Sequence, residues 1–385
     1  QGALKSAAAA ARRNAIWALA RIDAPAARAA VRQALADADE TVAQTALQAV
    51  SLWRDREPIE QLTALLSGKS AISARLAAEA LGRSGDMRAV GALLAATKRL
   101  RGTSVTSAGA PAEPAERLLE HALIYALIEI GARDAVYAQL TASRDARLRR
   151  VALVALDQMP GGKLQAKDVL DWLDSHESVL KLTAGWVVGN HSDWGDALAS
   201  FFGARLAQKN LSPDDRAALQ SQLARLTRSQ AIQDLLATTA ANASAPETRL
   251  LALRAMADAP LKESPARWLS ELSALLSKAG NAAPLARQAV ATARSLPLPR
   301  GGHPALAAAL AQTGRDTSLP AEVRLDALAA TAPAALSNVE PPLFDFLCTH
   351  LDSGQPMMVR GAAASALAKA PLSADQQLVL ADTLK

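Results

Sequence analysis

The stretch ARRNAIWALARIDAPAARAA, residues 11–30, decides the fold class of this chain. It carries the pattern Arg-x-x-Ala-x-x-Ala-Leu from Arg12 to Leu19 and then breaks at an Asp-Ala-Pro turn. Small and apolar residues three and four positions apart lie on one face of an α-helix, so the stretch predicts a helix, a turn and a second helix. The same pattern returns in full at Arg149 and at Arg360.

Degenerate copies of this pattern recur along the chain at the spacing of a helical hairpin. Aligned on their apolar positions, the copies start at residues 12, 43, 74, 116, 149, 181, 216, 249, 286, 324 and 360. We expect the arginines at or beside these starts to be structural anchors of the repeat, namely Arg12, Arg75, Arg149, Arg249, Arg324 and Arg360. A regular period of this size is typical of stacked repeats, so the sequence predicts an all-α, right-handed α-solenoid of about eleven helical hairpins.

The composition favours helices as well. Apolar residues make up 50% of the chain, yet aromatic residues make up only 3%, and alanine supplies much of the difference. Alanine is the best helix former because it loses no side-chain entropy in a helix. No run of residues alternates with the period of two that a half-buried strand requires.

The repeat spacing also predicts the domain organisation. We expect residues 1–385 to form a single repeat array, because each hairpin needs to pack only on its neighbours. The longest interval between starts contains residues 101–114, which are rich in Gly, Ser, Thr and Pro, so we expect an inserted, exposed loop there. The chain opens on Gln1 and enters directly on a helix, which favours a fragment of a larger protein.

Residues for common catalytic and metal sites are absent or isolated. The single cysteine, Cys348, lies in an apolar helical stretch and is expected to be a core thiol. The five histidines form no His-x-x-x-His pair, and the chain has neither a Gly-x-Gly-x-x-Gly nor a Walker motif. Ser178 and Lys181 match Ser-x-x-Lys without its companion motifs. We therefore expect no enzyme activity in this segment, no cofactor, and no catalytic or metal-binding residue.

The charge distribution restricts the partners. The net charge is +5, and the arginines are scattered rather than concentrated. A nucleic-acid-binding protein concentrates such residues on one face, so protein is the favoured partner and nucleic acid is disfavoured. No apolar run is long enough to predict a membrane span. The sequence leaves the oligomeric state open.

One segment concentrates bulky residues in this alanine-rich chain. Residues 176–202 hold two of the six tryptophans, two of the five histidines and two of the four phenylalanines. One interpretation is a packing wedge, since large aromatic side chains mostly fill volume in a core. The other is an interaction patch formed by Trp186, His191 and Trp194. The sequence does not decide between them.

The repeat resembles a known family. SARLAAEALGRSGDMRAVGALLAA, residues 73–96, is similar to HEAT repeats of the short bacterial type called PBS-lyase HEAT-like repeats. This resemblance implies the solenoid fold and a scaffold that contacts other protein. Some HEAT-like solenoids are DNA glycosylases, which gives an alternative function: nucleic-acid binding in a groove lined by the anchor arginines.

A narrower resemblance concerns the context of the segment. Residues 12–55 and 182–202 are similar to the HEAT-repeat middle region of large planctomycete and verrucomicrobial proteins. Those proteins carry a sugar-dehydrogenase-like propeller before the repeats and often a c-type cytochrome domain after them. The resemblance implies an extracytoplasmic parent protein, with dehydrogenase activity outside this segment. The segment itself would then space or dock the flanking domains.

Overall fold

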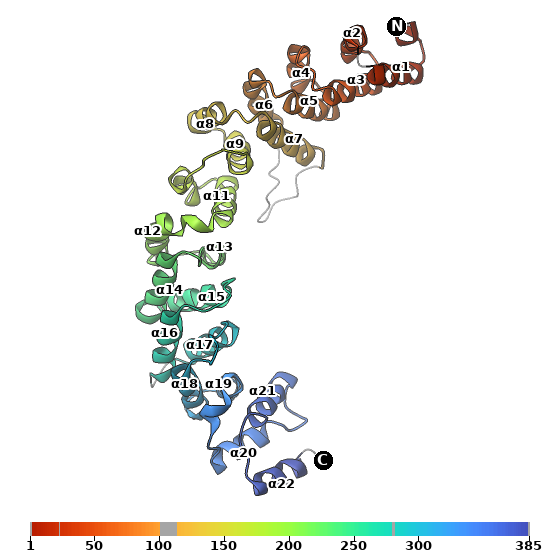
Figure 1. Ribbon diagram of the computed structural model, residues 1–385. Helices are drawn as coiled ribbons and strands as arrows, with labels where there is room; N and C mark the ends of the chain where they lie inside the picture. Colours follow the sequence, from red (N-terminus) through yellow and green to blue (C-terminus); the bar gives the residue numbers. More distant parts are fainter. Residues whose placement is uncertain (1, 23, 101–113, 279–281, 384–385) are drawn as a thin grey trace. The chain divides into compact units, whose positions relative to one another are not determined.

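The computed structural model of the protein describes residues 2–22, 24–100, 114–278 and 282–383 (Figure 1). In these ranges the chain forms 22 α-helices, seven short 3-10 helices and no strand. The odd-numbered helices are α1 (Ala9–Ile22), α3 (Glu40–Leu52), α5 (Ala71–Ser84), α7 (Pro114–Ile130), α9 (Ala146–Gln158), α11 (Ser178–Asn190), α13 (Pro213–Arg225), α15 (Pro246–Ala257), α17 (Ala283–Ser295), α19 (Ala321–Ala330) and α21 (Met357–Leu367).

The even-numbered helices complete the hairpins and vary more in length. They are α2 (Pro25–Gln33), α4 (Ile59–Leu66), α6 (Val90–Ala95), α8 (Arg133–Ala142), α10 (Leu170–Leu173), α12 (Gly195–Leu206), α14 (Gln230–Asn242), α16 (Ala266–Ser277), α18 (Pro304–Arg315), α20 (Pro341–Thr349) and α22 (Ala374–Thr383). The described residues thus contain eleven helix pairs, as the repeat spacing predicts.

The predicted repeat register is confirmed. All eleven starting positions lie in odd-numbered helices, which we call the motif helices, and ten of the starts are the fourth residue of their helix. The alanine and leucine positions of the pattern are buried between neighbouring helices; in α5, for example, Ala77 and Leu81 have no exposed surface. The first repeat differs, because in α1 only Ile16 is buried and Ala18 is exposed.

Local sequence signals set the helix ends. The side chain of Asp39 accepts hydrogen bonds from two main-chain N–H groups in the first turn of α3, and Asp145 does the same for α9. Such side chains satisfy donors that a helix leaves unpaired at its start. Gly85 and Gly131 follow α5 and α7 with φ angles of +67° and +68°, a region where glycine has no steric cost.

Contacts divide the chain into two compact units. Unit 1 is Gln1–Val187 and unit 2 is Val188–Lys385, so the boundary lies within α11. In unit 1 each motif helix from α1 to α9 contacts the next. In unit 2 the motif helices α13 to α21 form one row, and α12 to α18 form a second row beside it (Figure 1). The prediction of one continuous array across residues 1–385 stays a prediction.

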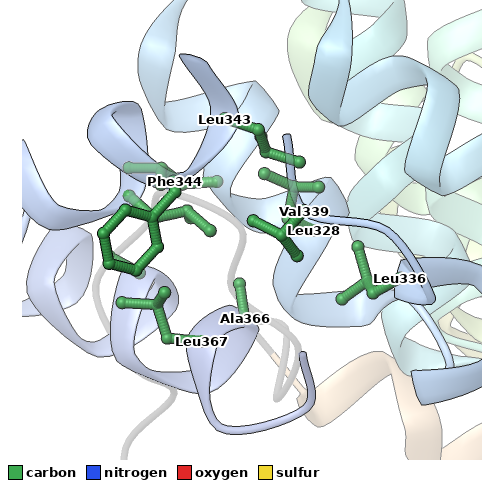
Figure 2. Close-up of a cluster of buried hydrophobic side chains, with 10 residues drawn as sticks. Leu328, Leu336, Val339, Leu343, Phe344, Ala366 and Leu367 are labelled. Atoms are coloured by element: carbon green, nitrogen blue, oxygen red, sulfur yellow. The ribbon is translucent and has the colours of Figure 1, made fainter. Parts of the chain in front are cut away.

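The core consists mainly of alanine, leucine and valine side chains, with a few buried aromatic residues such as Phe202 and Trp268. Figure 2 shows a cluster in unit 2 in which Leu328 of α19 and Phe344 of α20 lie near Ala366 and Leu367 of α21. Alanine positions let the motif helices approach closely, and leucines from both helix rows fill the remaining space. Cys348 is partly buried against this cluster, and burial raises the pKa of its thiol. It is therefore a packing residue.

The predicted insertion lies almost entirely outside the described residues, which omit 101–113. The expected loop range of 101–114 is one residue too long at its end. Pro114 is the first residue of α7, a position that suits proline because the first N–H of a helix has no partner within it.

Candidate functional site

Trp186 and the His191–Trp194 pair have different environments. Trp186 lies on α11 in unit 1 and is 43% exposed. In unit 2, the rings of His191 and Trp194 stack with centroids 3.9 Å apart and an angle of 5° between their planes. Trp194 is only 8% exposed, so its ring mainly packs. Trp186 offers a free aromatic surface, and the three-residue patch stays a prediction.

A second exposed tryptophan occupies the same place in another repeat. Trp17 of α1 is 40% exposed and, like Trp186, is the ninth residue of its motif helix. Trp17 and Trp186 each lie five residues after the starting position of their repeat, and His121 of α7 lies five residues after the start at residue 116. The sequence signal that identifies Trp17 is the register that it shares with Trp186.

The exposed face of α7 extends this aromatic character. Leu118 and Tyr125 are 55% and 52% exposed. They lie three residues before and four residues after His121, which places all three on one helix face. The rings of His121 and Tyr125 are nearly parallel, with centroids 6.5 Å apart. We call Trp17, Leu118, His121, Tyr125 and Trp186 the aromatic face of unit 1.

Most anchor arginines bind elements of the chain itself. Arg12 donates from Nε and Nη2 to both carboxylate oxygens of Asp37, at 2.8 and 2.9 Å. This contact lowers the pKa of the Asp37 carboxyl and raises that of the Arg12 guanidinium. Arg75 pairs with Glu79 at 3.2 Å, one turn later on α5. These arginines therefore serve packing and helix stability.

Two anchor arginines of unit 2 bind the end of the preceding helix. Arg249 Nε donates to the carbonyl of Ala240 at 2.8 Å, and Arg324 Nε donates to that of Gly314 at 3.1 Å. Both carbonyls lie in the last turn of a helix, where acceptors lack intrahelical donors and the dipole favours a cation. Arg324 also lies over the ring of Phe346, and burial lowers the pKa of its guanidinium.

The two remaining anchors differ from the rest. Arg149 of α9 lies over the ring of Trp172 at 5.9 Å, and its buried Nε has no hydrogen-bond partner in the described part of the chain. Arg360 is exposed at the start of α21. The six arginines thus have four kinds of environment: a carboxylate partner, a helix-end carbonyl, an aromatic ring, or solvent. They do not form one row of free charges.

Polar side chains link consecutive repeats. In unit 1, the guanidinium of Arg150 on α9 contacts Glu120 on α7 and donates to Thr183 on α11 at 3.2 Å. In unit 2, Thr292 of α17 donates to the carbonyl of Leu253 on α15 at 3.0 Å. These contacts fix the register between neighbouring hairpins because they satisfy polar groups that the packing buries.

An apolar cavity lies in unit 2. It has a volume of about 620 Å³ and is bounded by the end of α12, the end of α14 and the start of α15. Its lining is mostly apolar, with Lys209 and the ion pair between Arg216 and Glu247, 3.5 Å apart, at its edge. This composition gives it no set of groups suited to catalysis.

The described residues hold no group of three or more His, Cys, Asp or Glu side chains placed to bind a metal ion. In the same part of the chain, every helix is too short or too polar to span a membrane.

Comparison with known proteins supports the fold. HEAT repeats match at residues 1–82. No curated protein sequence matches the chain. Among solved structures, Kap121p bound to the extreme C-terminus of Cdc14p is 12% identical, with a TM-score of 0.57, and the match covers 100% of this chain and 46% of Kap121p. Kap121p bound to Ste12p is 14% identical, with a TM-score of 0.53 and coverage of 98% and 43%.

A third structure, the CpcE–CpcF complex of phycocyanin lyase from Nostoc sp. PCC7120, is 21% identical over 70% of this chain and 90% of that chain, but its TM-score of 0.32 is too low to carry an argument. The chain spans less than half the length of the karyopherins that it matches. These matches give no support to the dehydrogenase-associated resemblance. Together with the eleven helix pairs, the karyopherin matches identify the fold as a HEAT-like α-solenoid.

Proposed function

We propose that this chain is a non-catalytic scaffold that binds protein through the aromatic face of unit 1. The observation that carries the proposal is the exposure of Trp17 and Trp186 at the same position of their motif helices, 40% and 43%. Tryptophan and tyrosine dominate the binding energy of protein interfaces because they bury large areas at low cost in side-chain entropy.

The surroundings of the aromatic face suit a protein partner. Arg13 lies four residues before Trp17, and Arg117 lies four residues before His121, so these two rings each have an arginine one turn away, whereas Leu182 has this place before Trp186. Arginine beside tryptophan and tyrosine is the composition enriched in interface centres. Polar residues such as Gln48 and Glu79 occupy the corresponding positions of α3 and α5 and supply hydrogen-bonding groups.

The alternative, nucleic-acid binding in a groove of anchor arginines, has less support. It requires free cations at the repeat spacing, whereas Arg12, Arg75, Arg249 and Arg324 contact carboxylates or helix-end carbonyls of the chain. A phosphate backbone would have to compete with these contacts. Kap121p, by contrast, is seen bound to the extreme C-terminus of Cdc14p and to Ste12p, which shows protein binding by a solenoid of similar fold.

A narrower form of the proposal concerns where the partner comes from. If the resemblance to dehydrogenase-associated proteins holds, the partner surfaces are flanking domains of the same extracytoplasmic polypeptide. The solenoid then sets the distance between an oxidising domain and a cytochrome, with Trp186, His191 and Trp194 as the contact patch. Identification of the partner distinguishes an intramolecular from an intermolecular contact.

The test combines cross-linking with affinity measurement. A photo-reactive amino acid at position 121 captures neighbours in the native cell, mass spectrometry identifies them, and each is then purified for direct titration. Trp17→Ala and Trp186→Ala should each weaken binding by roughly tenfold or more, the effect of removing an interface hot spot. The matched control is Leu298→Ala, which removes an exposed apolar side chain, 47% exposed, from unit 2.

Two results would overturn the proposal. The first is a purified partner whose affinity is unchanged by both tryptophan substitutions. The second is tight binding of duplex DNA with a steep salt dependence, because that dependence reports phosphate contacts and promotes the nucleic-acid alternative.

A further inference from the structure

The fifth repeat departs from the others after its motif helix. Its second helix, α10, has only four residues, and the segment 159–169 replaces the missing turns. This segment folds back beside α8, the second helix of the preceding repeat. It borders an open surface pocket of about 380 Å³ lined by Arg133, Tyr137, Lys163, Lys167 and Asp168, among others.

Two acidic groups at this pocket are already engaged. Tyr137 donates its phenolic hydrogen to Asp168 Oδ1 at 2.8 Å, and the main-chain N–H of Gln165 donates to Asp168 Oδ2 at 2.9 Å. Asp134 accepts from Arg133 Nη1 at 2.7 Å. Both carboxylates therefore have donors within the protein: Asp134 is paired with a cation, and Asp168 accepts only from neutral donors and keeps its negative charge at the pocket.

The two lysines have no such engagement. Both Lys163 and Lys167 are exposed at the pocket, and in the described part of the chain no hydrogen bond or ion pair involves either side chain. Arg133 is held beside them, because its Nε donates to the carbonyl of Gly162 at 3.2 Å and its guanidinium lies 4.7 Å from the ring of Tyr137. The pocket thus carries three cationic side chains against two carboxylates, a net charge of +1, and the two lysines are the cations without a partner in the described residues.

The backbone holds Lys163 at a steric cost. Its φ angle is +50°, and only Arg54 shares a positive φ among the described residues other than glycine. Such a conformation disfavours a lysine and suits a glycine. Gly162 before it has no room for a side chain, since a Cβ there would lie 1.9 Å from the carbonyl oxygen of Leu156. The loop therefore has one defined path, with a lysine where glycine would be less strained.

We propose that this pocket binds a small dianionic phosphate group, with Lys163 and Lys167 as its charge partners. Lys163, Lys167 and Arg133 give the pocket three cationic groups for a phosphate monoester, which carries a charge of about −2 near neutral pH. Lysine binds phosphate as a point charge, and hydrogen bonds within the pocket wall hold both of its carboxylates in place. This inference is independent of the protein-binding role, since it concerns other residues of unit 1 and a different ligand.

The test uses inorganic phosphate as the probe on the whole chain. At constant ionic strength, phosphate should raise the melting temperature of the protein and shift the amide signals of residues 161–168, whereas chloride and acetate should not. Lys163→Gly with Lys167→Gln should weaken phosphate affinity about tenfold or more, the effect of losing charge-assisted contacts.

Lys163→Gly keeps the fold because glycine accepts the positive φ. Arg54→Gly is the matched control: it relieves the same backbone strain outside the pocket and should leave phosphate binding unchanged. An absent phosphate effect in the unsubstituted protein, an equal effect of acetate, or full retention of binding by the double variant would each overturn the assignment.

Discussion

The indole Nε1 of Trp268 donates a hydrogen bond to the main-chain carbonyl of Gln233, 2.9 Å away on the neighbouring helix of the preceding repeat. Trp268 lies on α16 and has no exposed surface, and Gln233 lies on α14. The side chain therefore fills the space between two repeats and also bonds them.

This relationship predicts two different costs of substitution. Trp268→Phe should keep most of the volume but lose the hydrogen bond, which costs about 1 kcal/mol. Trp268→Ala should cost about 3–5 kcal/mol, because it also leaves a cavity. Urea unfolding of both variants measures the difference. An unchanged stability in Trp268→Phe would mean that the hydrogen bond to Gln233 contributes nothing, and equal destabilisation by the two variants would mean that the cavity adds no cost.

Buried alanines of the motif helices should not accept a larger side chain. Ala80 and Ala155 are 1% and 0% exposed, so Ala80→Leu or Ala155→Leu should destabilise the protein by about 1–3 kcal/mol through overpacking. Ala291→Leu, at an exposed position of α17, is the control and should change stability little. An unchanged melting temperature for the first two variants contradicts the packing.

The contact between Arg12 and Asp37 predicts a pH dependence. The Asp37 pKa is lowered in the folded protein, chiefly by its hydrogen bond with Arg12. The folded state therefore favours the ionised carboxyl, and this contribution is present above the ordinary pKa of aspartate and is lost as the pH falls through the lower, folded value. The difference in unfolding free energy between the protein and Asp37→Asn should shrink on acidification; a constant difference would argue against the pairing.

Arg54 is expected to be suboptimal for stability. It follows α3 with a φ angle of +51°, and Arg54 and Asp55 donate main-chain hydrogen bonds to the carbonyls of Ser51 and Val50. This arrangement is the Schellman motif, whose left-handed position suits glycine. Arg54→Gly should therefore stabilise the protein by about 0.5–1 kcal/mol.

The reciprocal control is Gly85→Ala, which places a side chain at a φ angle of +67° and should destabilise the protein. A melting temperature that falls in Arg54→Gly would show that the arginine side chain stabilises the fold by more than the backbone strain costs.

The scaffold proposal predicts that the isolated segment has no chemistry of its own. Residues 1–385, expressed alone, should contain no stoichiometric metal, show no haem absorbance and oxidise no sugar. Elemental analysis, visible spectroscopy and turnover assays measure these properties. A bound metal in stoichiometric amount, or measurable turnover, would direct attention to the region around His191 and Trp194.

The repeat register could be predicted from the sequence because its determinants are local. Alanine and leucine at positions such as Ala77 and Leu81 define both the helix and its buried face. The environments of the anchor arginines could not be predicted, since Arg249 and Arg324 bind carbonyls whose positions depend on how two helices pack.

The candidate sites were predictable only in part. Trp186 can be recognised from the sequence because its segment is rich in aromatic residues. Trp17 can be recognised as a candidate interface residue only once the repeats are aligned and both tryptophans occupy the same position. The pocket beside Tyr137 joins residues about thirty positions apart in the sequence. It forms because α10 is short, and apart from the glycines at 161 and 162 no feature of the sequence predicts that short helix. Such features depend on tertiary packing rather than on local propensity.

The contact of Arg150 with Glu120 and Thr183 has a consequence for how unit 1 unfolds. Glu120 and Arg150 side chains are only 10% and 12% exposed, and the three residues belong to three consecutive repeats. If the middle repeat opened alone, it would leave a buried carboxylate without its cation, which is costly. Local opening of α9 should therefore take α7 and α11 with it. Amide hydrogen exchange in these three helices should then report one cooperative step that spans three repeats, instead of the one-repeat steps expected of an array with purely apolar interfaces.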